Sequence, residues 1–151
     1  MKSNLPIYAT LLFLWIFSSN GIAQTNKPIA TKKINFTIKK YENLPEWWNA
    51  VERTYMLNDD RTTEDVKYIG GVNPKMGEVF FIDSKIVIFN ENQIKVSNIK
   101  DLYKKTFTSG DYQIIMTWDD SERTGAYLDG KISLYYKNIL QFNSTFVQSG
   151  F

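Results

Sequence analysis

Residues 112–136 read YQIIMTWDDSERTGAYLDGKISLYY, and this stretch decides the fold class. Near its start, Ile114 and Met116 fall on one side of an extended chain, while Gln113 and Thr117 fall on the other. A period of two residues is typical of a β-strand with one buried face. The last residues of the stretch repeat this alternation. The stretch therefore predicts neighbouring antiparallel strands.

The dipeptide Asp129-Gly130 lies inside the second alternating part of this stretch. Asp-Gly favours a type I′ turn, because both central residues of that turn need a positive φ. We therefore predict a β-hairpin that turns at Asp129-Gly130, with strands over 124–128 and 131–136.

Short apolar segments separated by turn residues continue in both directions from this hairpin. The other predicted strands are Lys33–Tyr41, Val66–Gly70, Glu78–Asp83, Lys85–Asn90, Gln93–Asn98, Tyr112–Trp118 and Ile139–Val147. Tight turns are expected at Asp83-Ser84-Lys85, Asn90-Glu91-Asn92 and Ser109-Gly110-Asp111, and a short helical turn at Ile99, Leu102 and Tyr103. This rhythm is typical of an antiparallel meander.

The strands combine one apolar face with one mixed face, as expected when a sheet wraps around a single core. We therefore expect a mainly β chain whose meander forms a small lipocalin-like barrel or a sandwich. The first predicted strand lacks the Gly-x-Trp of true lipocalins, so membership of that family is not inferred.

One helix is predicted at the N-terminal end of the domain, over about 44–57. Asn43 is a favourable N-cap residue, and a Glu follows three positions later as in a capping box. Trp48 and Val51 belong to a set of apolar residues at helical spacing. A strand over 50–57 is the alternative, because Trp, Val, Thr and Tyr are mediocre helix formers.

Residues 1–23 have the composition of a secretory signal peptide. A basic residue precedes an apolar run over 7–17, and Gly21-Ile22-Ala23 places small residues before the expected cleavage site. The run is shorter than the ~20 residues of a membrane-spanning helix. We therefore expect an exported protein, periplasmic or extracellular, which is not an integral membrane protein after cleavage. An uncleaved N-terminal anchor is the alternative.

The remaining chain divides into a polar, flexible lead-in over 24–32 and a single β-rich domain over 33–151. It contains no Cys, so this exported domain must rely on packing and strand pairing instead of disulfides.

The composition excludes several classes of function. The chain has 0 His and 0 Cys, which excludes His/Cys metal sites, cysteine nucleophiles and Ser-His-Asp triads. No catalytic motif is present, and no cofactor is predicted. The net charge of +2 also argues against nucleic acid as a partner.

Three aromatic residues are candidates for contact with a ligand or partner: Trp47, Trp118 and Tyr127. Trp48 adjoins Trp47, and helical spacing predicts that Trp48 is buried and that Trp47 lies at the rim. Exposed tryptophans often form binding contacts, whereas packing inside the core is the more common role of such residues.

The acidic residues Asp119, Asp120 and Glu122 are a weak candidate for a calcium site. An EF-hand loop needs Gly at its sixth position and Glu at its twelfth. Counted from Asp120, the sixth residue is Gly125, but the twelfth is Lys131. A solvated turn is therefore the favoured interpretation, and no metal site is predicted.

Three functional hypotheses follow. The first is an exported, non-catalytic β domain that binds a small apolar ligand, a glycan or a partner protein. The second is a protein inhibitor or immunity-type partner that acts through its surface. The third is a small hydrolase with two carboxylates, because such chemistry needs no His. An aromatic cavity favours the first, a filled barrel the second, and two carboxylates in one cleft the third.

Overall fold

The alternating segments form one antiparallel sheet of nine strands in a computed structural model, which describes residues 32–57, 66–122 and 126–150. The strands are β1 (Arg53–Leu57), β2 (Lys67–Asn73), β3 (Gly77–Ile82), β4 (Lys85–Phe89), β5 (Ile94–Ile99), β6 (Leu102–Ser109), β7 (Tyr112–Asp119), β8 (Tyr127–Tyr136) and β9 (Ile139–Ser149). Four short 3-10 helices accompany them: η1 (Tyr41–Asn43), η2 (Glu46–Ala50), η3 (Glu91–Gln93) and η4 (Asp120–Glu122). The prediction of a mainly β, antiparallel chain is confirmed.

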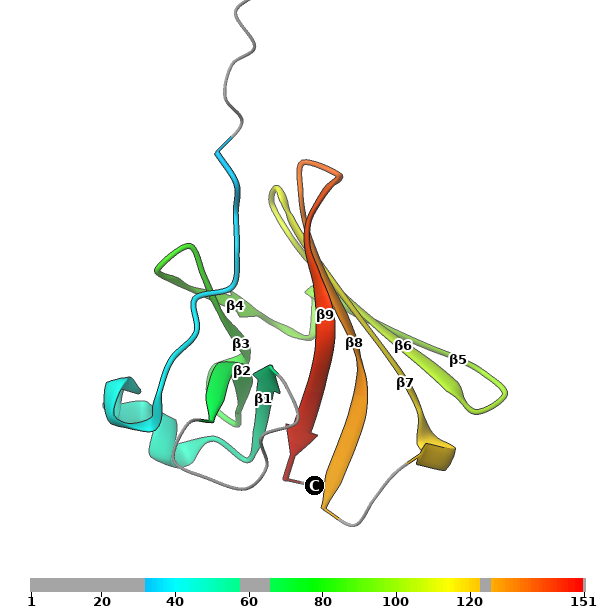
Figure 1. Cartoon of the computed structure of the whole chain (residues 1–151), viewed down its shortest axis with the longest axis horizontal. Coiled ribbons are helices and arrows are strands. Elements are labelled where there is room, and N and C mark those ends of the chain that lie inside the picture. The colour runs from blue at the N-terminus through cyan, green and yellow to red at the C-terminus, as the bar shows by residue number, and fades with distance from the viewer. Residues whose placement is uncertain (1–31, 58–65, 123–125, 151) are drawn as a thin grey trace, which may run out of the picture. The chain divides into compact units, whose positions relative to one another are not determined.

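The strand order is β4-β3-β2-β1-β9-β8-β7-β6-β5 (Figure 1). Two meanders, β1–β4 and β5–β9, are joined where β1 pairs with β9. The edge strands β4 and β5 follow each other in the chain and are linked by η3, so the sheet must curl to bring its two edges towards each other. The result is a half-barrel. A single curled sheet agrees with the barrel alternative and not with a sandwich of two sheets.

Aromatic side chains fill the inner face of this half-barrel. Tyr55 on β1 stacks on Phe80 of β3, with ring centroids 5.3 Å apart. Phe107 of β6 contacts Phe80 at 5.1 Å and Phe89 of β4 at 5.5 Å, so rings from both halves of the sheet meet. The predicted inward positions of β7 are confirmed, because Ile114 is fully buried in the same cluster. Within the described residues, packed rings therefore occupy this core.

The predicted helix over 44–57 is wrong in its second half. The helical part is only η2, and Arg53–Leu57 is strand β1, as in the alternative interpretation. The expected cap at Asn43 is also wrong, because Pro45 is the N-cap residue of η2 and no side chain caps it. After η2 the chain extends, and Glu52 N donates to Val72 O at 2.9 Å. Pairing with β2 and burial of the β1 side chains outweigh the helical spacing.

The predicted hairpin at Asp129-Gly130 is also wrong, because β8 runs through both residues without a turn. Gly130 pairs with Trp118 on one side and with Phe146 on the other. A Cβ on Gly130 would lie 2.6 Å from the ring of Phe146 and 2.4 Å from the carbonyl oxygen of Thr117. The missing side chain of Gly130 therefore leaves room for the ring of Phe146, and this position does not need a positive φ.

The two-residue turns with positive φ at both positions lie elsewhere. They are Asp83-Ser84, with φ of 50° and 63°, and Lys137-Asn138, with the same two values. The turn at Asp83-Ser84 was predicted, as was the one that contains Gly110, whose φ is 56°. Asn90-Glu91-Asn92, by contrast, leads through η3 to the opposite edge of the sheet and does not form a hairpin.

Strand β6 contradicts the predicted helical turn at Ile99, Leu102 and Tyr103. Leu102 begins a strand of eight residues that pairs with β5 and β7. The alternation of apolar and polar residues that predicts a strand is weak in β6, because Lys105 occupies an inward position next to the buried Phe107. The other predicted strands overlap β2, β3, β4, β5, β7 and β9.

The segment over 32–40, here called the N-terminal arm, is extended but pairs with the sheet only at isolated bridges. Phe36 pairs with Ile82, and Lys39 pairs with Tyr68. Phe36 is buried, as predicted, but Ile38 is 49 % exposed and does not share its inward face. The predicted strand over 33–41 is therefore only partly formed.

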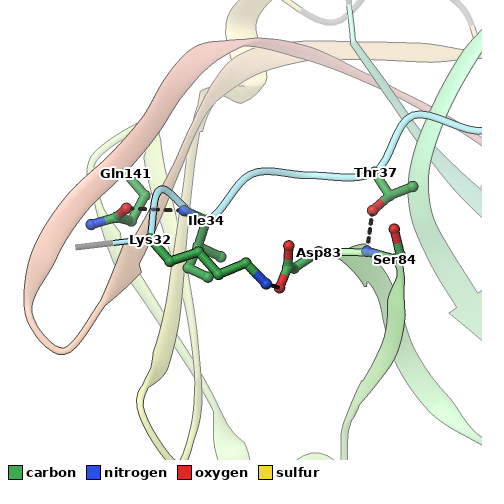
Figure 2. Close-up of polar contacts among 6 residues, drawn as sticks. All are labelled: Lys32, Ile34, Thr37, Asp83, Ser84 and Gln141. Atoms are coloured by element: carbon green, nitrogen blue, oxygen red, sulfur yellow. Dashed lines mark hydrogen bonds and ion pairs between the residues drawn. The ribbon is translucent and has the colours of Figure 1, made fainter. Parts of the chain in front are cut away.

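Side chains fix the arm to two distant parts of the sheet (Figure 2). Gln141 Oε1 on β9 accepts a hydrogen bond from Ile34 N at 3.1 Å. At the β3–β4 turn, Lys32 pairs with Asp83 at 2.6 Å, and Thr37 Oγ1 accepts from the backbone of the next turn residue. The arm thus bridges the two meanders.

The predicted signal peptide over 1–23 and the loop over 58–65 lie outside the described residues, as does almost all of the lead-in over 24–32. Within the described ranges, no helix is long and apolar enough to cross a membrane.

Candidate functional site

A cavity of about 570 Å³ lies against strands β6 to β9. The described residues that line it are Leu102, Thr117, Trp118, Asp119, Asp129, Gly130, Lys131, Thr145, Phe146 and Val147. Of the residues singled out from the sequence, Trp118 and Asp119 belong to this lining. The cavity therefore combines one predicted contact residue, Trp118, and one residue of the weak calcium candidate, Asp119, with further polar groups.

The cavity opens on the outer face of the sheet. Thr117, Lys131 and Thr145 occupy one register row across β7, β8 and β9. Their neighbours Met116 and Ile132 are buried in the core of the half-barrel. Because successive side chains of a strand point to opposite faces, the row that lines the cavity points away from the core.

Charged groups of both signs line the cavity: Asp119, Asp129 and Lys131. The carboxylate of Asp119 accepts hydrogen bonds from the hydroxyl of Ser121 at 2.6 Å and from its backbone N at 2.9 Å. The bond from the hydroxyl has the larger effect and the bond from the backbone N the smaller one, and together they hold the pKa of Asp119 below its ordinary value. Asp119 is therefore ionised at neutral pH and offers an acceptor at the end of β7.

Trp118 is half-buried and is fixed by a neighbouring ring. It stacks on Tyr103 of β6, with centroids 5.5 Å apart and an interplanar angle of 5°. The side chain of Trp118 also packs against the hydrophobic core. Because Trp118 follows the outward-facing Thr117 in β7, its ring lies on the core side of the sheet and does not project over the outer-face cavity.

The other two predicted contact residues do not line the cavity. Trp47 is half-buried at η2, where its ring lies 5.9 Å from Trp48 and 6.3 Å from Phe81. Trp48 is 6 % exposed, so the expected order of burial of the two tryptophans holds although the long helix is absent. Tyr127 is half-buried at the start of β8 and interacts with a neighbour.

The acidic residues of the weak calcium candidate lie at η4 and just before it. Asp119 is engaged by Ser121, and the side chain of Glu122 lies outside the described part. In the part of the chain that the structure describes, no three acidic side chains converge as a metal site would require.

A buried polar cluster inside the half-barrel was not predicted. The hydroxyl of Tyr55 donates to Glu78 Oε2 at 2.5 Å, and the ammonium of Lys105 donates to the other carboxylate oxygen. Burial, followed by the charge of Glu78, raises the pKa of Tyr55 well above its ordinary value. The sequence signal was the inward register of two charged residues, since Glu78 shares a face with Phe80 and Lys105 with Phe107.

No protein-family model, curated protein or solved structure matches this chain.

Proposed function

We propose that this chain is an exported, non-catalytic binding domain, and that the cavity against β6–β9 is its ligand site. The observation that carries the proposal is the cavity itself, whose volume of about 570 Å³ falls within the ~300–1,000 Å³ of small-molecule sites. Aromatic rings pack on the inner face, and this supports a site on the outer face of the sheet.

The composition of the lining favours an amphipathic ligand, and a short glycan is the best match among the ligands considered. Val147 and Leu102 supply apolar surface, while Thr117, Asp129 and Lys131 supply donors and acceptors. A sugar presents an apolar face together with several hydroxyl groups. Specific small-molecule sites usually combine a mainly apolar lining with a small number of polar groups that point toward the ligand.

The direct experiment is native mass spectrometry of the purified protein, followed by calorimetric titration with a panel of mono- and oligosaccharides. We expect a bound glycan, with binding weakened in Lys131→Ala and Thr117→Ala. The control is Lys95→Ala, an exposed lysine on β5 that does not line the cavity. Absence of saturable binding by any member of the panel, with the protein folded, would contradict the proposal.

A carboxylate hydrolase is the second candidate, because Asp119 and Asp129 both line this cavity. The lowered pKa of Asp119 suits a base or nucleophile, since a general acid needs a raised pKa. Hydrolysis of a bound glycan that is abolished in both Asp119→Asn and Asp129→Asn would support this candidate over simple binding.

Export is the part of the proposal that depends on residues 1–23. Their basic start, apolar run and small residues before Gln24 support it. N-terminal sequencing of the protein recovered from its native host should begin at Gln24. A mature protein that retains Met1, or one recovered from the cytoplasm, would contradict export.

A further inference from the structure

A second, smaller concavity lies between the N-terminal arm, the segment around η1 and the β3–β4 hairpin. It measures about 200 Å³, and its described lining is Thr37, Lys39, Asn43, Leu44, Pro45, Phe81, Ser84, Lys85 and Ile86. We call it the arm groove. It shares no described lining residue with the cavity against β6–β9, so nothing in the function proposed above depends on it.

Part of the arm groove is apolar. Leu44 and Pro45, both half-buried, supply this surface, and Phe81 lies beneath it at 2 % exposure. The rings of Trp47 and Trp48 pack on Phe81 from nearby, at 6.3 Å and 5.5 Å. Ile86 on β4 continues the apolar surface outward and is 48 % exposed. An aliphatic or aromatic group placed here would remove exposed apolar surface from water.

The described lining carries charge of one sign only. Its charged residues are Lys39, which is half-buried, and Lys85, which is exposed. Within the described ranges, neither ammonium group has a carboxylate partner, whereas Lys32 of the same arm pairs with Asp83. A partly desolvated cation without a counter-charge favours an anion beside it.

Hydrogen bonds hold the two walls of the groove in place. Thr37 N donates to Phe81 O at 2.8 Å, and Ser84 N donates to Thr37 Oγ1 at 2.6 Å (Figure 2). Farther along the arm, Lys39 N donates to the carbonyl oxygen of Tyr68 at 2.9 Å. Binding therefore does not have to order the walls first, which lowers its entropic cost.

We propose that the arm groove binds a small amphipathic carboxylate, such as a medium-chain fatty acid. The carboxylate lies between the ammonium groups of Lys39 and Lys85, and the apolar tail covers Leu44 and Ile86. The volume is below the ~300 Å³ at which typical drug-sized sites begin, so the ligand is short. Two lysines and no carboxylate in the described lining select an anion over a neutral or cationic analogue.

The test is a titration of the purified full chain with octanoate, followed by calorimetry and by tryptophan fluorescence. Fluorescence is informative because Trp47 and Trp48 both contact Phe81 in the groove wall. We expect saturable binding of octanoate, and weak or no binding of octanol and octylamine at the same concentrations. Equal binding of the three compounds would overturn the proposal, because it would show that charge plays no part.

Variants locate the site. Lys39→Ala and Lys85→Ala should each weaken octanoate binding by up to about fivefold, the upper end of the range for one exposed charge pair. Lys85→Arg should retain binding, while Lys104→Ala on β6 and Lys131→Ala in the larger cavity should leave it unchanged. Undiminished binding in a folded Lys39→Ala/Lys85→Ala variant would overturn the proposal. If that variant fails to fold, Lys85→Glu at an exposed position provides the test, and unchanged affinity for octanoate in that variant would equally overturn the proposal.

Discussion

Lys105 on β6 donates its ammonium group to the carboxylate of Glu78 on β3, and the two strands are not neighbours in the sheet. Backbone pairing takes β3 to β2 and β4, and β6 to β5 and β7. The ion pair therefore connects the two meanders through side chains, inside a core of aromatic rings. Both side chains are largely buried, at 15 % and 8 % exposure.

Removing one partner of this pair should be strongly destabilising. Lys105→Met leaves the carboxylate of Glu78 buried with only the Tyr55 hydroxyl, and the expected loss is about 3–5 kcal/mol in the free energy of unfolding. Urea denaturation of Lys105→Met, Glu78→Gln and the double variant measures it. The double variant should be more stable than additivity predicts, and strictly additive losses would show that the pair is not coupled.

The raised pKa of Tyr55 predicts a loss of stability in alkaline solution. The phenol has an ordinary pKa of about 10, and burial beside Glu78 raises it in the folded state. Above pH ~10 the unfolded chain loses this proton while the folded chain keeps it, so the free energy of unfolding falls as pH rises.

The Tyr55→Phe variant isolates this contribution. Because Phe cannot ionise, the stability difference between the original protein and the variant should shrink as pH rises above ~10. Urea unfolding over about pH 8 to 11 measures the difference. A constant difference across that range would contradict the assigned pKa shift. Tyr68, whose pKa is also raised by burial, is present in both proteins and cancels.

Gly130 should be sensitive to any side chain, for a steric reason. Gly130→Ala places a Cβ against Phe146 and the Thr117 carbonyl, with an expected loss of about 1–3 kcal/mol. Gly110→Ala is the control, because its site is open space and only its positive φ opposes alanine.

A second variant separates the two possible obstacles to a side chain at Gly130, which are the ring of Phe146 and the carbonyl oxygen of Thr117. Phe146→Leu shortens the ring that the new Cβ would meet, so it should cost less stability in the Gly130→Ala background than in the original protein. Melting temperatures of the four proteins give the comparison. Equal costs in both backgrounds would mean that the ring of Phe146 is not the obstacle.

The two adjacent tryptophans should differ in their contribution to stability. Trp48 is buried and packs edge-on against Tyr68 at 5.4 Å, so Trp48→Ala should lose about 3–5 kcal/mol. Trp47 is only half-buried, so Trp47→Ala should lose clearly less. Urea midpoints measure both variants. Equal losses would show that Trp47 is as much a part of the core as Trp48.

The sequence predicts those strands in which the period of two residues is uninterrupted. Ile114 and Met116 share one side of their strand, Gln113 and Thr117 share the other, and the strand and its buried face are both confirmed. Strand β6 was missed because Lys105 replaces an apolar residue at an inward position. An inward charge becomes plausible only when its partner, Glu78, is known to lie opposite, and that contact joins residues far apart in the chain.

Two of the structural errors, the hairpin at Asp129-Gly130 and the helix over 44–57, share a cause. Asp129-Gly130 favours a turn locally, and the segment after Asn43 favours a helix locally, but neither local preference reflects the neighbours that the sheet supplies. Phe146 requires a glycine beside its ring, and β2 offers backbone partners to β1. Tertiary packing outweighs propensities of this size.

The candidate site was only partly predictable for the same reason. Trp118 and Asp119 were identified by residue type, but Lys131 and Thr145 join them only through the register of β7, β8 and β9. The arm groove depends on contacts between the arm and the β3–β4 turn, which no local pattern in the sequence indicates.

The pairing of β1 with β9 has a consequence for folding. Thr54 pairs with Ser149, and their hydroxyl groups lie 2.9 Å apart although 95 positions separate them in the chain. The hairpins of each meander form from local contacts, but β1 keeps an unpaired edge until the last strand of the chain is available. Contacts of such high sequence separation slow folding and leave strand edges open to association with other chains. Pairing with β9 therefore covers this edge of β1 and joins the two meanders into one sheet.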